Sequence, residues 1–194
     1  MQRKGHVFLL IGPSGSGKTT LIHRMCSLDS KIRFLPTTTT RRPRVGEADG
    51  REYFFVSDDA FDRLIADGQL LEWQVIHGNR YGTSRTRIAE AIDQGIIGIT
   101  SIDILGGLAV KQAFPQTSTS VFVRPSSRSE LRQRLLRRGD ASPEDLRRRL
   151  ERADMEWNLA DRCDFTVVND GGCLEQALDQ LVSIMHRRLD PSPD

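Results

Sequence analysis

Short apolar runs alternate with amphipathic stretches along most of the chain. The runs that predict strands cover residues 7–11, 32–35, 52–57, 70–76, 96–102, 120–123 and 165–168. Apolar positions three to four residues apart predict helices over 20–26, 58–67, 84–93, 108–114, 127–138, from 142 onward and over 174–187. Because strands and helices alternate, the pattern predicts an α/β fold with helices on both faces of a parallel sheet.

Residues 37–83 interrupt this alternation. Residues 36–50 are rich in Thr, Arg, Gly and Pro, which predicts a loop. The strand-like runs at 52–57 and 70–76 follow with little helix between them. We therefore expect a lobe inserted into one domain that spans residues 1–194.

Composition narrows the class of protein. The net charge is +2, which predicts no strong field for nucleic acid or membranes, and 38% of residues are apolar, enough for a core. Three cysteines without metal-ligand spacing predict buried, reduced thiols. The apolar run near the N-terminus is too short for a signal-peptide core, and no run approaches a membrane span, so we expect a cytoplasmic protein.

The most informative motif lies between the first predicted strand and helix. Residues 12–19 read GPSGSGKT and fit the pattern G-x-x-x-x-G-K-[ST]. Glycines there let backbone N–H groups face a phosphate, and the helix N-terminus adds partial positive charge. Lys18 is placed to reach the outer phosphates and the Thr19 hydroxyl to hold Mg²⁺. The expected ATP contacts in this loop are Gly12, Pro13, Ser14, Gly15, Ser16, Gly17, Lys18, Thr19 and Thr20.

A second group of candidates follows the loop. Arg41 and Arg44 flank a proline and, with Tyr53, form a candidate clamp for a phosphate monoester; a solvated basic loop is the alternative. Glu72 lies inside an apolar strand, where a carboxylate needs a partner. That partner is either a base with adjacent N–H donors or an arginine, and spacing alone favours the salt bridge.

Nine segments together resemble the guanylate kinase family. They cover about residues 5–188, and several motifs in one order are more specific than any single one. The segments are 12–19, 39–44, 46–50, 53–57, 71–73, 77–83, 134–139, 148–150 and 168–170.

The resemblance implies transfer of the γ-phosphoryl group of ATP to GMP or dGMP. It implies a core (5–36, 84–126 and 157–188), a GMP-binding lobe (37–83) and a lid (127–156), followed by a disordered tail (189–194). Arg41, Arg44, Tyr53 and Tyr81 resemble the clamp on the GMP phosphate, and Thr37, Glu72, Thr83 and Asp103 resemble the guanine contacts. Asn169 and Asp170 resemble contacts to the adenine end of ATP. Arg138 and Arg149 resemble lid arginines that close on the transferring phosphoryl group.

The lid arginines have simpler alternatives. Arg149 follows Asp145 by four residues and Arg148 follows Glu144 by four, so both fit helix ion pairs. Arg138 fits a cation at a helix C-terminus. The family register favours a functional role for Arg138 and Arg149, and less so for Arg134.

The chain departs from the family after the central strand. Where the family has acid-Ile-Asp-x-Gln-Gly, this chain has Ser101-Ile-Asp-Ile-Leu-Gly106. Asp103 remains, but Ser101 and Leu105 replace the first acid and the glutamine. The missing acid puts metal coordination or base choice in question, and we hypothesise weaker discrimination at the purine 2-amino group.

Two other functions fit part of the sequence. A ribose 1,5-bisphosphate kinase shares the phosphate loop and the lid, but lacks the Arg-Pro-Arg clamp and the Leu-Glu-Trp segment present here. A non-catalytic guanylate-kinase-like binding module usually has a degraded phosphate loop, whereas Lys18 and Thr19 are intact. The sequence shows no clear dimer stripe and predicts neither a monomer nor a homo-oligomer.

Overall fold

The computed structural model describes residues 4–76, 78–138 and 142–190, with only the backbone at residue 138. Five parallel strands form the central sheet, in the order β2-β7-β1-β8-β9. They are β1 (His6–Ile11), β2 (Ile32–Phe34), β7 (Ile97–Ile102), β8 (Ser118–Arg124) and β9 (Phe165–Val168). This confirms the predicted α/β class.

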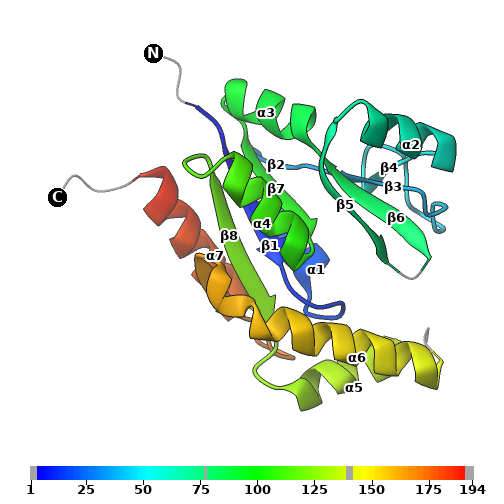
Figure 1. The fold of residues 1–194 in the computed structure, drawn as a ribbon. Coiled ribbons are helices and arrows are strands. Elements are labelled where there is room, and N and C mark those ends of the chain that lie inside the picture. Colours follow the sequence, from blue (N-terminus) through cyan, green and yellow to red (C-terminus); the bar gives the residue numbers. More distant parts are fainter. Residues whose placement is uncertain (1–3, 77, 139–141, 191–194) are drawn as a thin grey trace.

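Helices cover both faces of the central sheet (Figure 1). The side chains of β1 alternate between the faces, as a strand requires. Phe8 and Leu10 pack with α1 (Lys18–Leu28) and α7 (Leu174–Leu189). Val7, Leu9 and Ile11 pack with α3 (Arg85–Asp93) and α4 (Ile104–Ala113). The five buried positions of β1 therefore contribute to two separate cores.

A second sheet occupies most of the predicted insertion, with α2 (Asp58–Ala66) beside it (Figure 1). Its order is β4-β3-β6-β5, and its strands are β3 (Thr37–Thr39), β4 (Tyr53–Phe55), β5 (Leu70–Ile76) and β6 (Asn79–Ser84).

Two predictions in this region were wrong. The expected loop over 36–50 contains β3, and residues 79–84, for which we predicted no strand, form β6. β3 has no apolar side chain, but its buried threonines are satisfied by long-range partners. Thr39 Oγ1 donates to Arg80 O over 2.9 Å, and Thr38 Oγ1 accepts from Arg87 Nη1 over 3.1 Å. A search for apolar runs cannot find strands of this kind.

Two helices near the carboxyl ends of the central strands form a third unit, α5 (Arg128–Arg138) and α6 (Pro143–Asn158). In Figure 1 they lie below the central sheet. They pack through Leu131, Leu135 and Ala153, a core separate from the other two. The predicted start of α6 is confirmed, because Ser142 Oγ accepts from Asp145 N over 3.2 Å with Pro143 in the first turn.

The ends of other helices differ from the predicted ones. α4 starts at Ile104, four residues before the expected start at 108, because the Asp103 carboxylate caps it by accepting from Gly106 N over 2.8 Å. The expected tail of residues 189–194 was wrong at Leu189, which is the last residue of α7. Residues 191–194 of that tail fall outside the described residues. In the described part of the chain, no helix is both long and apolar enough to cross a bilayer.

Candidate active site

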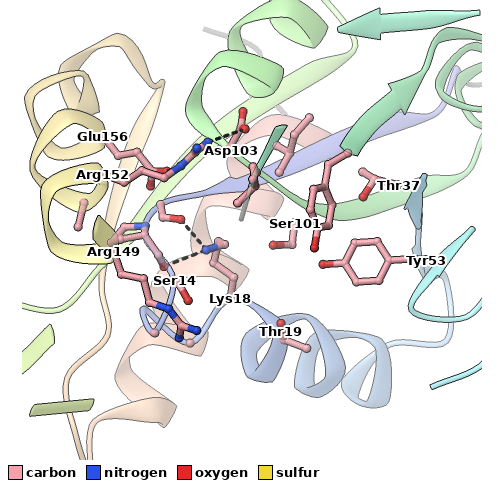
Figure 2. Close-up of a pocket in the computed structure, with 18 of the residues that line it drawn as sticks. Ser14, Lys18, Thr19, Thr37, Tyr53, Ser101, Asp103, Arg149, Arg152 and Glu156 are labelled. Atoms are coloured by element: carbon pink, nitrogen blue, oxygen red, sulfur yellow. Dashed lines mark hydrogen bonds and ion pairs between the residues drawn. The ribbon is translucent and has the colours of Figure 1, made fainter. Parts of the chain in front are cut away.

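One cavity of about 620 Å³ is lined by the phosphate loop, both sheets and α5 and α6 (Figure 2). Most of the residues selected from the sequence line it, although they come from widely separated segments. They are Gly12, Pro13, Ser14, Gly15, Gly17, Lys18, Thr19, Thr20, Thr37, Arg44, Tyr53, Glu72, Tyr81, Thr83, Asp103 and Arg149.

The loop between β1 and α1 has the backbone that its glycines allow. Gly12, Gly15 and Gly17 have φ values of 139°, 88° and 92°, in a region that other residues rarely adopt. A Cβ atom on Gly12 would also clash with the carbonyl oxygen of Val123. Lys18 Nζ donates to Gly12 O over 2.5 Å and to Pro13 O over 3.0 Å, so the ammonium group lies over the loop.

Three expected ATP contacts lie outside the cavity lining, and one of them, Asn169, supports the loop. The Asn169 side chain is buried and its Nδ2 donates to Ser16 O over 2.8 Å. A Cβ atom on Gly17 would clash with the same Nδ2 atom, so Asn169 also requires this glycine. Asp170 Oδ1 accepts from Ser126 N over 2.7 Å. Neither Ser16, Asn169 nor Asp170 lines the cavity.

The predicted clamp is divided between the cavity and the layer behind it. Arg44, Tyr53 and Tyr81 line the cavity, with the two tyrosine rings 5.8 Å apart edge to face. Burial raises the pKa of the Tyr53 phenol, which keeps it a hydrogen-bond donor. Arg41 is not part of the lining. It pairs with Glu47 over 2.9 Å, and its guanidinium lies 5.3 Å from the centre of the Tyr53 ring.

The carboxyl group of Glu72 lines the cavity from β5. Thr83 Oγ1 donates to its Oε1 over 3.0 Å, and the carboxylate forms no ion pair among the described residues. The alternative of a Glu72–arginine salt bridge is therefore wrong. Burial, with the nearby charge of Asp103, raises the pKa of Glu72 to about 7. The group can therefore change its charge near neutral pH.

Sequence reasoning missed a polar network next to Glu72. Gln74 Nε2 donates to Asp103 Oδ1 over 2.8 Å, and Arg152 on α6 pairs with Asp103 Oδ2 over 3.0 Å. Arg152 Nε also donates to the buried Glu156 over 3.2 Å. Burial raises the pKa of Glu156, while the positive charges of Lys18 and Arg152 act against this rise. Two signals in the sequence point to Arg152: it follows Arg149 by three residues, which places both on one helix face, and it precedes Glu156 by four, which fits a helix ion pair.

The other arginines of α5 and α6 differ in position. Arg134 and Arg137 line the cavity, and Arg134 also pairs with Glu130 over 2.8 Å. Arg148 forms the predicted ion pair with Glu144 over 2.6 Å and is exposed. Arg149 lines the cavity, whereas the Arg138 side chain lies outside the described residues.

Few protein groups could hold a metal ion in this cavity. Within the described residues, no group of three or more His, Cys, Asp or Glu side chains is arranged so that it could hold a metal ion. The Thr19 hydroxyl at the start of α1 lines the cavity and has the hard oxygen that Mg²⁺ prefers. Ser101 also lines it and is drawn between Lys18 and Tyr53 in Figure 2. This donor set fits Mg²⁺ only if phosphate oxygens supply the other ligands.

Comparison with known proteins points to one family. The family model described as "Guanylate kinase" matches residues 4–188. The chain is 44% identical over 180 residues to a guanylate kinase of Thiobacillus denitrificans, covering 93% of this chain and 85% of the relative. It is 37% identical to that of Thermotoga maritima, covering 94% and 86%. A crystal structure of guanylate kinase from Anaplasma phagocytophilum superposes with a TM-score of 0.75 at 25% identity, covering 99% of this chain and 90% of the other. The chain belongs to the guanylate kinase family.

Proposed function

We propose that this protein transfers the γ-phosphoryl group of ATP to GMP or dGMP, forming ADP and GDP or dGDP. The observation that carries the proposal is one cavity that joins a phosphate loop to the half-buried carboxyl group of Glu72, with five arginines and two tyrosines also in its lining. The relatives named guanylate kinase support the same reaction.

The donor side is the loop of residues 12–19 with Thr20. Backbone N–H groups and the α1 N-terminus suit the phosphates of ATP, and Lys18 supplies positive charge at the outer phosphates. Mg²⁺ would be held by Thr19 and by the phosphates, and would neutralise charge that develops during transfer. Asn169 holds the loop through Ser16, and we propose that Asp170 acts with it at the adenine end.

The acceptor side is built from the second sheet and the end of β7. We propose that Arg44, Tyr53 and Tyr81 bind the GMP phosphate, with Arg41 holding Tyr53 from behind. Thr37, Glu72, Thr83 and Asp103 are the proposed guanine contacts. Ionised Glu72 would accept hydrogen bonds from the adjacent N–H donors of guanine. A pocket that is empty, or that holds a base without those donors, leaves the desolvated carboxylate unpaired, which costs free energy.

α5 and α6 supply the remaining charge. Phosphoryl transfer depends on positioning and on cations around the moving group, since little covalent chemistry falls to the protein. Arg149 lines the cavity on the same face of α6 as Arg152, and we propose that it and Arg138 stabilise the transferring phosphoryl group. A lid over residues 127–156 would also exclude water that otherwise hydrolyses ATP.

The setting follows from the same proposal. The three cysteines, Cys26, Cys163 and Cys173, are free, which suits the reducing cytoplasm. We place the enzyme there, in purine nucleotide metabolism, with ATP and GMP or dGMP as its small-molecule partners.

The direct test is to incubate the protein with ATP, Mg²⁺ and GMP and to separate the nucleotides by chromatography. We expect ADP and GDP in equal amounts, and no GDP when Lys18→Ala replaces the wild-type protein. Binding of both nucleotides without GDP formation would instead identify a non-catalytic binding module.

A further inference from the structure

Arg152 lines the cavity and has no role in the function proposed above. It lies on α6, three residues after Arg149, which lines the same cavity. Ala153 and Glu156 line it too. Spacings of three, four and seven residues place all four on one helical face, so the position of Arg152 and the position of Arg149 are set together.

The contacts of Arg152 reach three separate parts of the fold. Its Nη2 pairs with Asp103 Oδ2 over 3.0 Å and donates to Gln74 Oε1 over 3.2 Å, while its Nε donates to Glu156 Oε1 over 3.2 Å. Asp103 lies where the central sheet meets α4, and Gln74 lies on β5 of the second sheet. One guanidinium therefore connects α6 to both sheets, and Figure 2 marks its contact with Asp103 by a dashed line.

The partner of Arg152 is itself held firmly. Asp103 Oδ1 accepts from Gly106 N and from Gln74 Nε2, both over 2.8 Å, so Arg152 pairs with the carboxylate oxygen that these two bonds leave. Gln74 Nε2 also lies 3.5 Å from Glu72 Oε2. The Arg152 side chain is 28% exposed and that of Asp103 13% exposed. An ion pair this shielded, with a fixed geometry, is a better anchor than a surface pair.

Two neighbouring arginines of α6 show the contrast. Arg147 and Arg148 pair with Glu151 and Glu144, and their side chains are 68% and 59% exposed. Both pairs connect residues within α6, so they do not fix the position of the helix relative to the sheets.

We propose that Arg152 is a positioning residue whose ion pair with Asp103 anchors α6 against the acceptor side and thereby directs Arg149 toward the phosphate loop. The catalytic consequence rests on the proposed function. An acceptor base that engages Glu72 and Asp103 acts on the same contacts that hold α6. Occupation of the acceptor site and placement of Arg149 are then coupled through one carboxylate.

The test is a double-mutant cycle on kcat with Arg149→Gln, Arg152→Gln and the double variant. We expect about a 100-fold loss for Arg149→Gln and about a 10-fold loss for Arg152→Gln, with the KM for ATP changed less than about twofold. The double variant should lose about 100-fold, because an unanchored Arg149 has little left to contribute. A loss near the product of the two single effects overturns the proposal.

Two controls separate positioning from general stability. Arg148→Gln, on the exposed face of α6, should keep the wild-type kcat and Tm. Arg152→Lys should recover part of the kcat, because it restores charge opposite Asp103 without the fork that also reaches Glu156. If Arg152→Gln lowers the Tm but keeps the wild-type kcat, its role is structural only and the proposal is wrong.

Hydrogen exchange tests the anchor without turnover. Amides of α6 should exchange faster in Arg152→Gln than in wild-type protein or Arg148→Gln. Unchanged exchange overturns the anchor even if the enzyme is active. Faster exchange supports the anchor even if wild-type protein forms no GDP, in which case the proposed function alone has failed.

Discussion

The two ends of the cavity are built in different ways. The phosphate loop is a continuous segment whose geometry follows from its own glycines, with Asn169 as its main distant support. The acceptor side is held together by contacts between separate elements. Thr83 on β6 donates to Glu72 on β5, and Asp103 before α4 accepts from Gln74 on β5 and pairs with Arg152 on α6. The geometry of the loop needs only the strand and the helix on either side of it. The geometry of the acceptor side depends on how the two sheets and α6 pack together.

The largest effect should come from removing the charge of the loop. Lys18→Ala should lower kcat by about 10³-fold, because a cation at the transferring phosphoryl group contributes mainly to the transition state. The Tm should stay within a few degrees, since the lysine contributes no core packing. The exposed Lys31→Ala is the matched control, and steady-state kinetics with thermal melts give both quantities. A kcat within tenfold of wild type would contradict the role of the loop.

On the acceptor side, Glu72→Gln should affect binding of one substrate. We expect the KM for GMP to rise about 100-fold, because a neutral amide replaces the acceptor of charge-assisted hydrogen bonds. The KM for ATP should remain within about twofold, because the loop is built independently. The exposed Glu90→Gln should match wild type. Equal increases in both KM values would remove the distinction between the two sides.

The pH dependence of the KM for GMP is a second test of the difference between the loop and the acceptor side. Burial raises the pKa of Glu72 to about 7, so the carboxyl group is mostly protonated at pH 6 and mostly ionised at pH 8. Because the ionised form accepts from guanine, the KM for GMP should fall about 10-fold as the pH rises from 6 to 8. Glu72→Gln retains only the titration of the GMP phosphate itself. Parallel KM profiles for wild type and Glu72→Gln would show that Glu72 does not titrate in this range.

A smaller effect is expected behind the loop. Asn169→Ala removes the hydrogen bond to Ser16 O and leaves that carbonyl buried, which should lower the free energy of unfolding by about 1–2 kcal/mol. The KM for ATP should rise about fivefold while the KM for GMP stays constant. Urea unfolding and kinetics measure both, with the exposed Asn158→Ala as control. A change confined to the KM for GMP would contradict this placement of Asn169.

The smallest effect concerns Ser101, which lines the cavity and is drawn between Lys18 and Tyr53 (Figure 2). Lys18 and Tyr53 are both proposed phosphate contacts, so we expect Ser101 to act at the phosphates and not at the base. Ser101→Asp should lower the Mg²⁺ concentration for half-maximal activity by about threefold and leave the ratio of GMP to IMP turnover unchanged. A higher ratio with unchanged Mg²⁺ dependence would support the hypothesis that Ser101 weakens discrimination at the 2-amino group.

The same contrast explains what could be predicted. Local apolar periodicity predicts the parallel sheet and its helices, and glycine spacing predicts the loop between β1 and α1. The structure confirms these elements. β3 was missed because its three threonines show no apolar run, although Thr38 and Thr39 are buried. The connecting role of Arg152 was missed because its partners outside α6 lie 49 and 78 residues away in sequence, and local spacing carries no information on them.

Local spacing also suggested a partner and an equivalence between two residues that the structure does not show. Spacing favoured an arginine partner for Glu72, but the structure gives it Thr83 from the neighbouring antiparallel strand. Arg148 and Arg149 had equivalent helical spacing, yet only Arg149 lines the cavity, because adjacent residues on a helix point about 100° apart.

The central claim is that this cavity binds a guanine nucleotide as phosphoryl acceptor, and the acceptor profile tests it most directly. ADP release should be measured at one ATP and Mg²⁺ concentration with GMP, dGMP, IMP, AMP and ribose 1,5-bisphosphate. We predict the highest kcat/KM with GMP and dGMP, lower values with IMP, and negligible values with AMP and ribose 1,5-bisphosphate. A preference for ribose 1,5-bisphosphate or AMP, or no ADP release with any acceptor, would contradict the account.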